Sequence, residues 1–244
     1  LTRLPECVDV MRNDEDLSNR QSRADRIKQY LEDSFPRVHG VMLNADQLLA
    51  LYHATRSGVS VINGGPGTGK TSTIATIVEY YRQLGELQGV VLLAPTGRAA
   101  AIMSERCLTP AFTIHKALFS ASVNLDSARV IILDEVSMID YPLMDKLLMK
   151  CHSITSLILV GDHNQLRSID FGRLMGDCIQ CSLFNCTNLA INYRQSGKYG
   201  VISRNATVVM DRKAHDMVEE KDVFEIVPNL LSTDDVLNEI SSQY

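Results

Sequence analysis

Eight residues in the first third of the chain restrict its fold more than any other part of the sequence. Residues 64–71 read Gly-Gly-Pro-Gly-Thr-Gly-Lys-Thr, and they lie between an apolar run, 59–63, and a segment of helical periodicity, 71–84. Glycines let the backbone curl so that successive N–H groups point at phosphate oxygens, and the following helix adds the partial positive charge of its N-terminus. The pattern predicts a phosphate-binding loop between a strand and a helix. The alternative, a glycine-rich turn without a ligand, accounts for neither the apolar run nor the Lys-Thr pair.

Short apolar runs alternate with helix-length segments over much of the chain. The runs are 59–63, 90–94, 130–133, 157–160 and 189–191, and the helix-length segments include 71–84, 99–106 and 142–151. Buried continuous strands that alternate with helices indicate a parallel sheet covered on both faces. We therefore predict an α/β fold, a three-layer P-loop NTPase domain, preceded by a polar segment, 1–40, that contains a short helical patch.

The charge balance excludes some classes of function. Lys and Arg total 24, Asp and Glu total 29, and the net charge is therefore −5 at pH 7. An acidic chain is not expected to coat nucleic acid by bulk charge, so any contact with nucleic acid must be local. No apolar run reaches the ~20 residues of a bilayer-spanning helix, and we expect no membrane segment.

Three of the six cysteines, Cys178, Cys181 and Cys186, lie close together in the sequence. A chain of this length with many apolar runs does not need a disulfide framework, so we expect reduced thiols and a cytoplasmic location. Cys178 and Cys181 form a Cys-x-x-Cys pair, which zinc sites also use, but such a site would need a fourth ligand and a loop setting. The apolar stretch 174–184 favours buried free thiols on a helix instead.

An acidic pair supplies a second requirement for nucleotide chemistry. The apolar run 130–133 ends in Asp134 and Glu135, which in combination with the phosphate loop predicts hydrolysis and not binding alone. We expect Asp134 and the Thr71 hydroxyl to hold Mg²⁺, Lys70 to bind the β- and γ-phosphates, and Glu135 to orient and deprotonate the attacking water. The residues predicted to contact the bound nucleotide in the loop are Gly65, Pro66, Gly67, Thr68, Gly69, Lys70, Thr71 and Ser72.

A third polar segment follows the strand expected at 157–160. It reads Gly-Asp-His-Asn-Gln-Leu and contains Gln165. A polar side chain beyond a neighbouring strand end can contact the γ-phosphate, and we assign this role to Gln165. The alternative is an ordinary turn, because Asp and Asn favour turns. The cofactors predicted from these segments are ATP and Mg²⁺.

These segments, taken in order, resemble the motifs of superfamily 1 helicases. Residues 64–71, 94–100, 133–140 and 161–166 are similar to motifs I, Ia, II and III, and 193–195 to motif IV. The chain resembles most the RecD-like group, the α subunit of exodeoxyribonuclease V and its stand-alone relatives. The tract that follows Glu135 and the tract 166–172, leading to Asp177, carry this likeness, which extends over about 40–230.

The resemblance implies roles for further residues. Gln47 occupies the position of the family's adenine-reading glutamine, although Asn44 to Gln47 also reads as a helix capping box. Arg194 matches the arginine that reaches the γ-phosphate and stabilises the departing phosphoryl group. The residues expected to bind the DNA backbone are Pro95, Thr96, Arg98, Thr113 and His115. For His115, a role as an ordinary helix residue is an equal alternative.

The resemblance also implies an activity and a domain organisation. The family uses ATP to translocate 5′ to 3′ on single-stranded DNA and to unwind duplexes, with ATP between two RecA-like domains. Motifs V and VI of the second domain are not found in this sequence. We expect 1–40 to be a linker or the end of a preceding module, 41–221 to be the first RecA-like ATPase domain, and 222–244 to lead into the second. The implied partners are single-stranded DNA, the second RecA-like domain and subunits of a nuclease–helicase complex. The alternative is a non-motor module of the same fold that binds nucleotide, single-stranded DNA or protein.

Overall fold

The computed structural model describes residues 43–56, 58–165, 168, 171–181 and 183–193. The chain divides into two units, 1–192 and 193–244, and the described residues belong to the first unit except for Tyr193. The predictions made for 1–40, for Arg194 and for 222–244 lie outside the described residues. Within the described residues, no helix combines the length and the apolar character that crossing a bilayer requires.

The described part of the chain is built on one parallel sheet of six strands, in the order β3-β2-β4-β5-β1-β6. The strands are β1 Gly58–Gly64, β2 Val90–Ala94, β3 Ala111–Thr113, β4 Val130–Leu133, β5 Ser156–Gly161 and β6 Asn185–Leu189. Three of the interior strands, β1, β4 and β5, are buried along their whole length, as expected for a parallel sheet covered on both faces. The α/β fold predicted from the alternating runs, of the RecA-like P-loop type, is confirmed.

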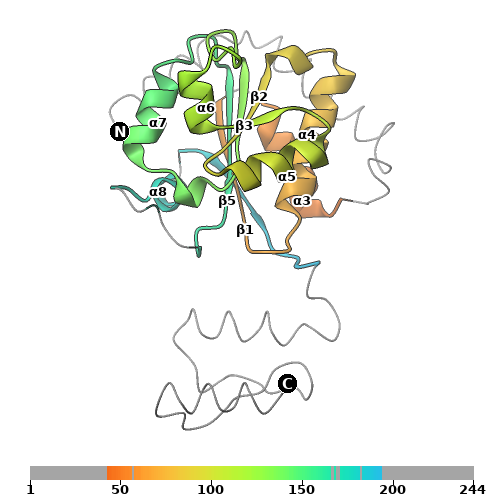
Figure 1. The fold of residues 1–244 in the computed structure, drawn as a ribbon. Coiled ribbons are helices and arrows are strands. Elements are labelled where there is room, and N and C mark those ends of the chain that lie inside the picture. Colours follow the sequence, from red (N-terminus) through yellow and green to blue (C-terminus); the bar gives the residue numbers. More distant parts are fainter. Residues whose placement is uncertain (1–42, 57, 166–167, 169–170, 182, 194–244) are drawn as a thin grey trace, which may run out of the picture. The chain divides into compact units, whose positions relative to one another are not determined.

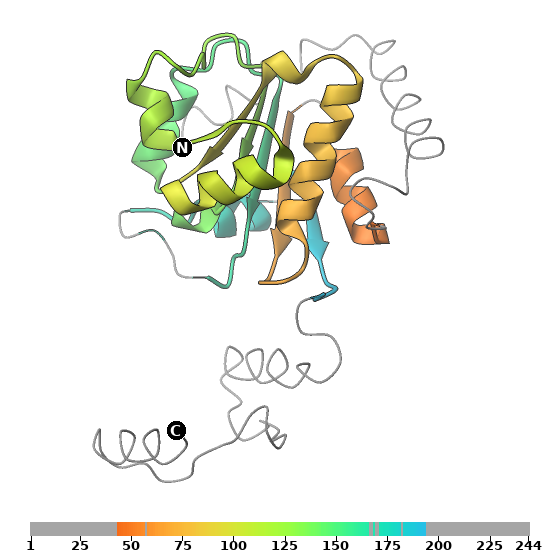
Figure 2. The same cartoon turned by 45° about the vertical axis from the view of Figure 1, so that its right-hand side comes forward.

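Helices cover both faces of the sheet and make three layers (Figure 1). The helices are α3 Ala45–Ala54, α4 Lys70–Gln83, α5 Gly97–Cys107, α6 Ile114–Phe119, α7 Tyr141–Leu148 and α8 Leu174–Gln180, with short 3-10 turns η2 Leu87–Gly89 and η3 Val136–Met138. Successive strand residues point to opposite faces, so Ile131 packs in the core beneath α6, α7 and α8, whereas Ile132 packs beneath α3, α4 and α5. Figure 2 shows α4 and α5 lying over the second of these faces.

The structure differs from the sequence-based expectation at both edges of the sheet. The last strand is β6, Asn185–Leu189, and not 189–191, and β3 was not expected as a strand at all. Both are edge strands with partly exposed residues, so neither carries the continuous apolar run by which the central strands were recognised. The other strands and the three expected helices begin and end within three residues of their predicted positions.

The expectation of buried free thiols on a helix is correct for Cys178 and wrong for Cys181. Cys178 is buried on α8, and burial raises the pKa of its thiol to about 12. Cys181 is exposed just beyond the end of α8, and Cys186 is half-buried on β6. The stretch 174–184 therefore contains α8, which ends at Gln180, and a turn at Cys181, whereas Cys186 lies beyond the stretch on β6.

The segment around α8 is fixed to α7 through Tyr141. The Tyr141 hydroxyl donates a hydrogen bond to the carboxylate of Asp177. Gly172 has φ +135° and lies against the same ring, where a Cβ atom would come within 2.6 Å of Tyr141 Cδ2. These contacts give a physical reason for the glycine and the aspartate in the tract that resembles the RecD-like group.

Candidate active site

The phosphate-binding loop connects the carboxyl end of β1 to the first turn of α4. Gly67 and Gly69 have φ values of 82° and 88°, in the left-handed region that favours glycine. A Cβ atom on Gly64 would lie 2.5 Å from Thr68 Oγ1 and 3.1 Å from Leu189 Cβ, so the loop folds tightly over this residue. Thr68 Oγ1 donates to the carbonyl of Gly65 at 2.9 Å and closes the turn.

Lys70 folds back over this loop from the start of α4. Its Nζ atom donates to the carbonyl oxygens of Gly64 at 2.6 Å and Gly65 at 3.0 Å. The ammonium group is therefore held at the start of the loop, and a bound phosphate would offer it charged oxygens in place of the two carbonyls. Thr71 and Ser72 follow in the first turn of α4, half-buried and exposed respectively.

Asp134 and Glu135 follow β4 and are oriented by the backbone. The Asp134 N–H donates to Leu93 O on β2 at 3.0 Å, and the Glu135 N–H donates to Asp134 Oδ1 at 2.9 Å. Glu135 has φ 53°, a left-handed conformation that is uncommon for a residue with a side chain and that reverses the chain at this point. The two carboxylates therefore leave the strand end in a fixed, strained geometry, as is frequent at functional sites.

Burial controls the protonation of Asp134. Its side chain belongs to a residue that is only 8% exposed, and burial raises its pKa to about 6. The negative charge of Glu135 also raises the pKa, whereas the Glu135 backbone N–H and the positive charge of Lys70 lower it. A buried carboxylate of this kind suits a divalent cation, because the positive charge of the cation would stabilise the negative charge of Asp134.

Thr96 connects the segment after β2 to Glu135. Its hydroxyl donates to Glu135 Oε2 at 3.4 Å and accepts a hydrogen bond from the Ala99 N–H at 3.2 Å, which caps α5. One side chain thus serves as a helix N-cap and as a neighbour of the carboxylate predicted to be the base. The sequence did not suggest the contact with Glu135, because Thr96 and Glu135 lie 39 positions apart.

The segment after β5 forms a turn beside the acidic pair. Gln165 N donates to Asp162 O at 3.1 Å, and Asn164 N donates to Asp162 Oδ1 at 3.0 Å. The ordinary-turn alternative is therefore correct as a description of the backbone, and it leaves the Gln165 side chain exposed at the sheet edge. A Cβ atom on Gly161 would lie 3.2 Å from Val136 N, which shows how closely β5 approaches the residues after Glu135.

Gln47 makes the capping box that the sequence offered as an alternative to adenine binding. Its Oε1 atom accepts from Asn44 N at 3.0 Å, and Asn44 Oδ1 accepts from Gln47 N at 2.9 Å. Gln47 is 2% exposed. The capping box uses the amide oxygen, so any contact with adenine would fall to the amide nitrogen.

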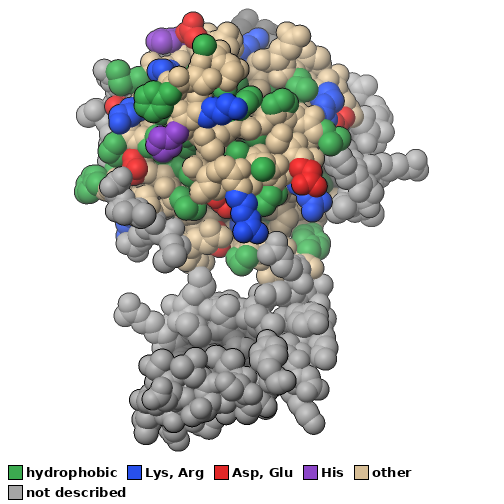
Figure 3. All heavy atoms as spheres, in the orientation of Figure 1, with side chains coloured by type: hydrophobic (Ala, Val, Ile, Leu, Met, Phe, Trp, Pro, Cys, Tyr) green, Lys and Arg blue, Asp and Glu red, His purple; other side chains and the backbone are tan. Residues whose placement is uncertain are grey.

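The residues expected to bind DNA follow β2 and β3 at the same edge of the sheet. Pro95 and Thr96 are half-buried, and Arg98 is exposed on α5. Thr113 caps α6 by accepting from Lys116 N at 3.1 Å, and His115 is exposed on that helix. On the face drawn in Figure 3, the Lys and Arg side chains of the described residues are separated by other side chains and form no continuous basic area.

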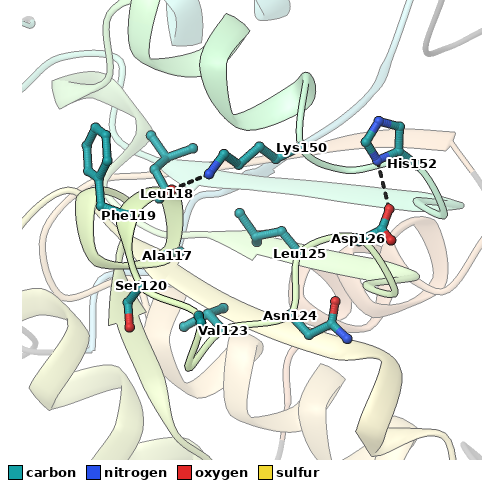
Figure 4. A pocket seen from close by; sticks show the side chains of 11 residues that line it. Ala117, Leu118, Phe119, Ser120, Val123, Asn124, Leu125, Asp126, Lys150 and His152 are labelled. Atoms are coloured by element: carbon teal, nitrogen blue, oxygen red, sulfur yellow. Dashed lines mark hydrogen bonds and ion pairs between the residues drawn. The ribbon is translucent and has the colours of Figure 1, made fainter.

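A hollow lies at the other end of the strands, away from the phosphate loop and before the first residues of β4 and β5. It has a volume of about 590 Å³ and is lined by residues from α6, the loop after α6 and the segment after α7. Figure 4 shows Lys150 donating to the Leu118 carbonyl and His152 bonded to Asp126 across its rim. None of the residues predicted to bind nucleotide or DNA lines it.

Several amides at the carboxyl ends of the strands, beside the phosphate loop, were not identified from the sequence. Asn63, the residue before Gly64, contacts Asn188 on β6 and His163 after β5. Asn192 Nδ2 donates to the carbonyl of Pro66 in the phosphate loop at 3.0 Å. The sequence signal for them is weak: a polar residue at the end of an otherwise apolar run.

These features define a P-loop NTPase domain: a glycine-rich loop with its lysine follows a strand, an acidic pair lies nearby, and the parallel sheet lies between layers of helices. The sequence matches the AAA domain family over residues 47–170, and the chain belongs to that family. The RecD subunit of the RecBCD enzyme of Haemophilus influenzae is 32% identical over 188 residues, which are 64% of this chain and 29% of that protein. The RecD subunit of Mycobacterium tuberculosis H37Rv is 31% identical over 186 residues, 64% of this chain and 32% of that protein.

Among solved structures, the Pif1 helicase of Candida albicans has a similar fold, with a TM-score of 0.55 at 20% identity over 83% of this chain and 54% of that one. The chain spans about a third or less of the length of these RecD subunits. The RecD-like resemblance predicted from the motifs is confirmed.

Proposed function

We propose that this chain contains the first RecA-like motor domain of a RecD-like DNA helicase, which hydrolyses ATP to move 5′ to 3′ on single-stranded DNA. The observation that supports it best is the convergence of the phosphate loop, the acidic pair and the turn at Gln165 on one edge of a parallel sheet. Ligands of such sheets bind outside the carboxyl ends of the strands. The chain matches only about a third of each RecD subunit, so the helicase activity of a whole protein is proposed and does not follow from the match.

In the proposed complex, the loop amides and Lys70 bind the phosphates of ATP. The Lys70 ammonium, now on the carbonyls of Gly64 and Gly65, would turn to the β- and γ-phosphate oxygens. Thr71 and Asp134 would hold Mg²⁺, which when bound supplies positive charge to the phosphate oxygens. The raised pKa of Asp134 fits this role, since the buried carboxylate gains a cationic partner.

Glu135 would act as the general base on the attacking water, with Gln165 at the γ-phosphate. The left-handed backbone at Glu135 fixes where its carboxylate leaves the strand end. Arg194, outside the described residues, would stabilise charge on the departing phosphoryl group, together with groups from the second RecA-like domain. Gln47 would contact adenine through its amide nitrogen.

DNA would bind along the neighbouring part of the same edge. Thr96 and Thr113 cap the helices that follow β2 and β3, so backbone amides of two helix N-termini lie beside them. Helix N-termini are favourable sites for phosphate groups. Pro95, Arg98 and His115 complete the proposed contact, which would position DNA without reading its sequence.

The proposed organisation places a linker or the end of another module at 1–40, the ATPase domain at 41–221 and the connection to a second RecA-like domain at 222–244. The RecD relatives are named as subunits of the RecBCD enzyme, so subunits of a nuclease–helicase complex are proposed partners. A cytoplasmic location follows from this proposal. The chain by itself should unwind little DNA, because translocation requires two domains that close around the nucleotide.

ATP titration against Lys70→Ala tests the nucleotide site. Loss of this charge should weaken binding of Mg²⁺-ATP by about 1.5–3 kcal/mol, the range for a hydrogen bond to a charged group. Lys146→Ala, an exposed lysine on α7, is the matched control and should bind as the wild type does. Equal affinity of wild type and Lys70→Ala would overturn the assignment.

Glu135→Gln separates a motor from a non-motor module. In a protein that includes the second RecA-like domain, the variant should bind ATP normally and lose hydrolysis, because the amide keeps the shape and cannot accept the proton. Wild-type protein that binds ATP but does not hydrolyse it, with DNA and the second domain present, would favour the non-motor alternative.

A further inference from the structure

Three strand ends at the proposed active site are joined through one buried amide. Asn63, at the end of β1, is paired in register with Gly161 of β5 on one side and with Asn188 of β6 on the other. Its Nδ2 atom donates to Asn188 Oδ1 at 2.8 Å, and its Oδ1 atom accepts from both the backbone N and the ring Nδ1 of His163 at 3.1 Å. Asn63 is 8% exposed, whereas the His163 side chain is exposed.

The donors and acceptors in this contact are determined by the backbone. The N–H of His163 can only donate, so the atom of Asn63 that faces it must be the amide oxygen. That oxygen cannot donate, so His163 Nδ1 must carry a hydrogen. The amide nitrogen of Asn63 then faces Asn188, whose oxygen accepts. Only one orientation of the Asn63 amide and one tautomer of His163 give every donor in these hydrogen bonds an acceptor.

This contact lies between the phosphate loop and the turn that carries Gln165. Asn63 directly precedes Gly64, whose carbonyl accepts from Lys70. His163 is the second residue of the turn in which Asn164 and Gln165 bond back to Asp162. The turn is closed by its own hydrogen bonds, and the two bonds to Asn63 set its position relative to the phosphate loop.

We infer that Asn63 and His163 are positioning residues that hold Gln165 at the γ-phosphate, so that the domain's preference for a nucleoside triphosphate over a diphosphate depends on them. The inference rests on the proposed function, because it concerns the same nucleotide site. Neither residue needs to touch the nucleotide. A diphosphate, which has no group for Gln165 to contact, should bind equally well whether or not the turn is held.

Two substitutions of His163 test this with matched size and polarity. In His163→Asn, an amide atom attached to Cγ can replace Nδ1 as the donor, whereas in His163→Gln the amide lies one bond further out. Both keep the backbone N–H bond. Isothermal titration of the full chain with Mg²⁺ and either ADP or the non-hydrolysable analogue AMP-PNP gives the two affinities. We expect His163→Gln to weaken AMP-PNP about five- to tenfold, the effect of one hydrogen bond, with ADP unchanged and with both affinities retained in His163→Asn.

Asn63→Ala removes both bonds to His163, together with the bond to Asn188, and should reduce AMP-PNP binding further. Adding His163→Gln to Asn63→Ala should then have no additional effect, because the partner is already absent. Equal losses for ADP and AMP-PNP, or unchanged binding in His163→Gln, would overturn the inference while leaving nucleotide binding intact. Failure of the wild type to bind either nucleotide would overturn the proposed function itself, and a wild type without preference between them would overturn the positioning role alone.

Discussion

Asp134→Asn should stabilise the nucleotide-free domain at neutral pH. Burial raises the pKa of the Asp134 carboxyl from 3.8 to about 6, against the lowering effects of the Glu135 N–H and the Lys70 charge. Because the pKa in the folded state exceeds that in the unfolded state, the folded protein binds the proton more tightly. Ionisation of Asp134 therefore opposes folding, and the free energy of unfolding falls as the pH rises.

The size of the effect follows from the difference in pKa. A shift of about two units corresponds to about 3 kcal/mol. The loss of stability begins near the unfolded value of 3.8, is complete above about 6 and is constant from there on. Asparagine carries no charge, and its Oδ1 atom can still accept the Glu135 N–H that Asp134 accepts at 2.9 Å. We expect a gain of about 1–3 kcal/mol at about pH 7.5 and little gain at about pH 4.

Urea denaturation of wild type and variant across this pH range, without Mg²⁺ or nucleotide, measures the gain. Asp145→Asn, an exposed carboxylate on α7, is the control and should change the free energy of unfolding by no more than about 0.5 kcal/mol at any of these pH values. Ligand binding to the folded state adds to its stability. With Mg²⁺ and ATP present, the wild type should therefore gain more stability than Asp134→Asn, because the variant lacks the carboxylate proposed to hold Mg²⁺. A variant less stable than the wild type at neutral pH, or a gain independent of pH, would refute the reasoning.

Three further predictions concern other parts of the domain. Thr96→Val should lower the free energy of unfolding by about 1 kcal/mol because α5 loses its N-cap, and should weaken binding of labelled single-stranded DNA in anisotropy titrations; Thr96→Ser should retain both. Gly172→Ala should destabilise the fold by about 1–3 kcal/mol through a left-handed backbone and a clash with an aromatic ring, measured as a lower urea midpoint. Iodoacetamide followed by peptide mapping should modify exposed Cys181 much faster than Cys178, whose thiol has a pKa of about 12 in its buried position; equal rates would contradict the packing of α8.

The central part of the fold could be predicted because its sequence signal is local. The strands β2 and β4 are continuous apolar runs, buried except for the half-buried Val91 of β2, and each begins and ends where the sequence predicts. The edge strands could not be found in this way. In β6, Asn185–Leu189, exposed, half-buried and buried residues are mixed along a largely polar segment, and its pairing with β1 is a property of the assembled sheet. Hydrophobic periodicity therefore located the interior of the sheet and missed its borders.

The residues of the candidate site likewise fall into those that the sequence predicts and those that it does not. Lys70, Asp134 and Gln165 were predicted because each follows a strand of one parallel sheet, and parallel strands present their carboxyl ends at one edge. Which of these segments bond to each other depends on register, and no residue carries that information alone. Asn63 contacts Asn188 and His163 because β1 lies between β6 and β5 in the sheet, a strand order that the sequence does not display. The residues that perform the proposed chemistry can thus be identified from the sequence, whereas the residues that hold them in place can be identified only from the paired strands of the structure.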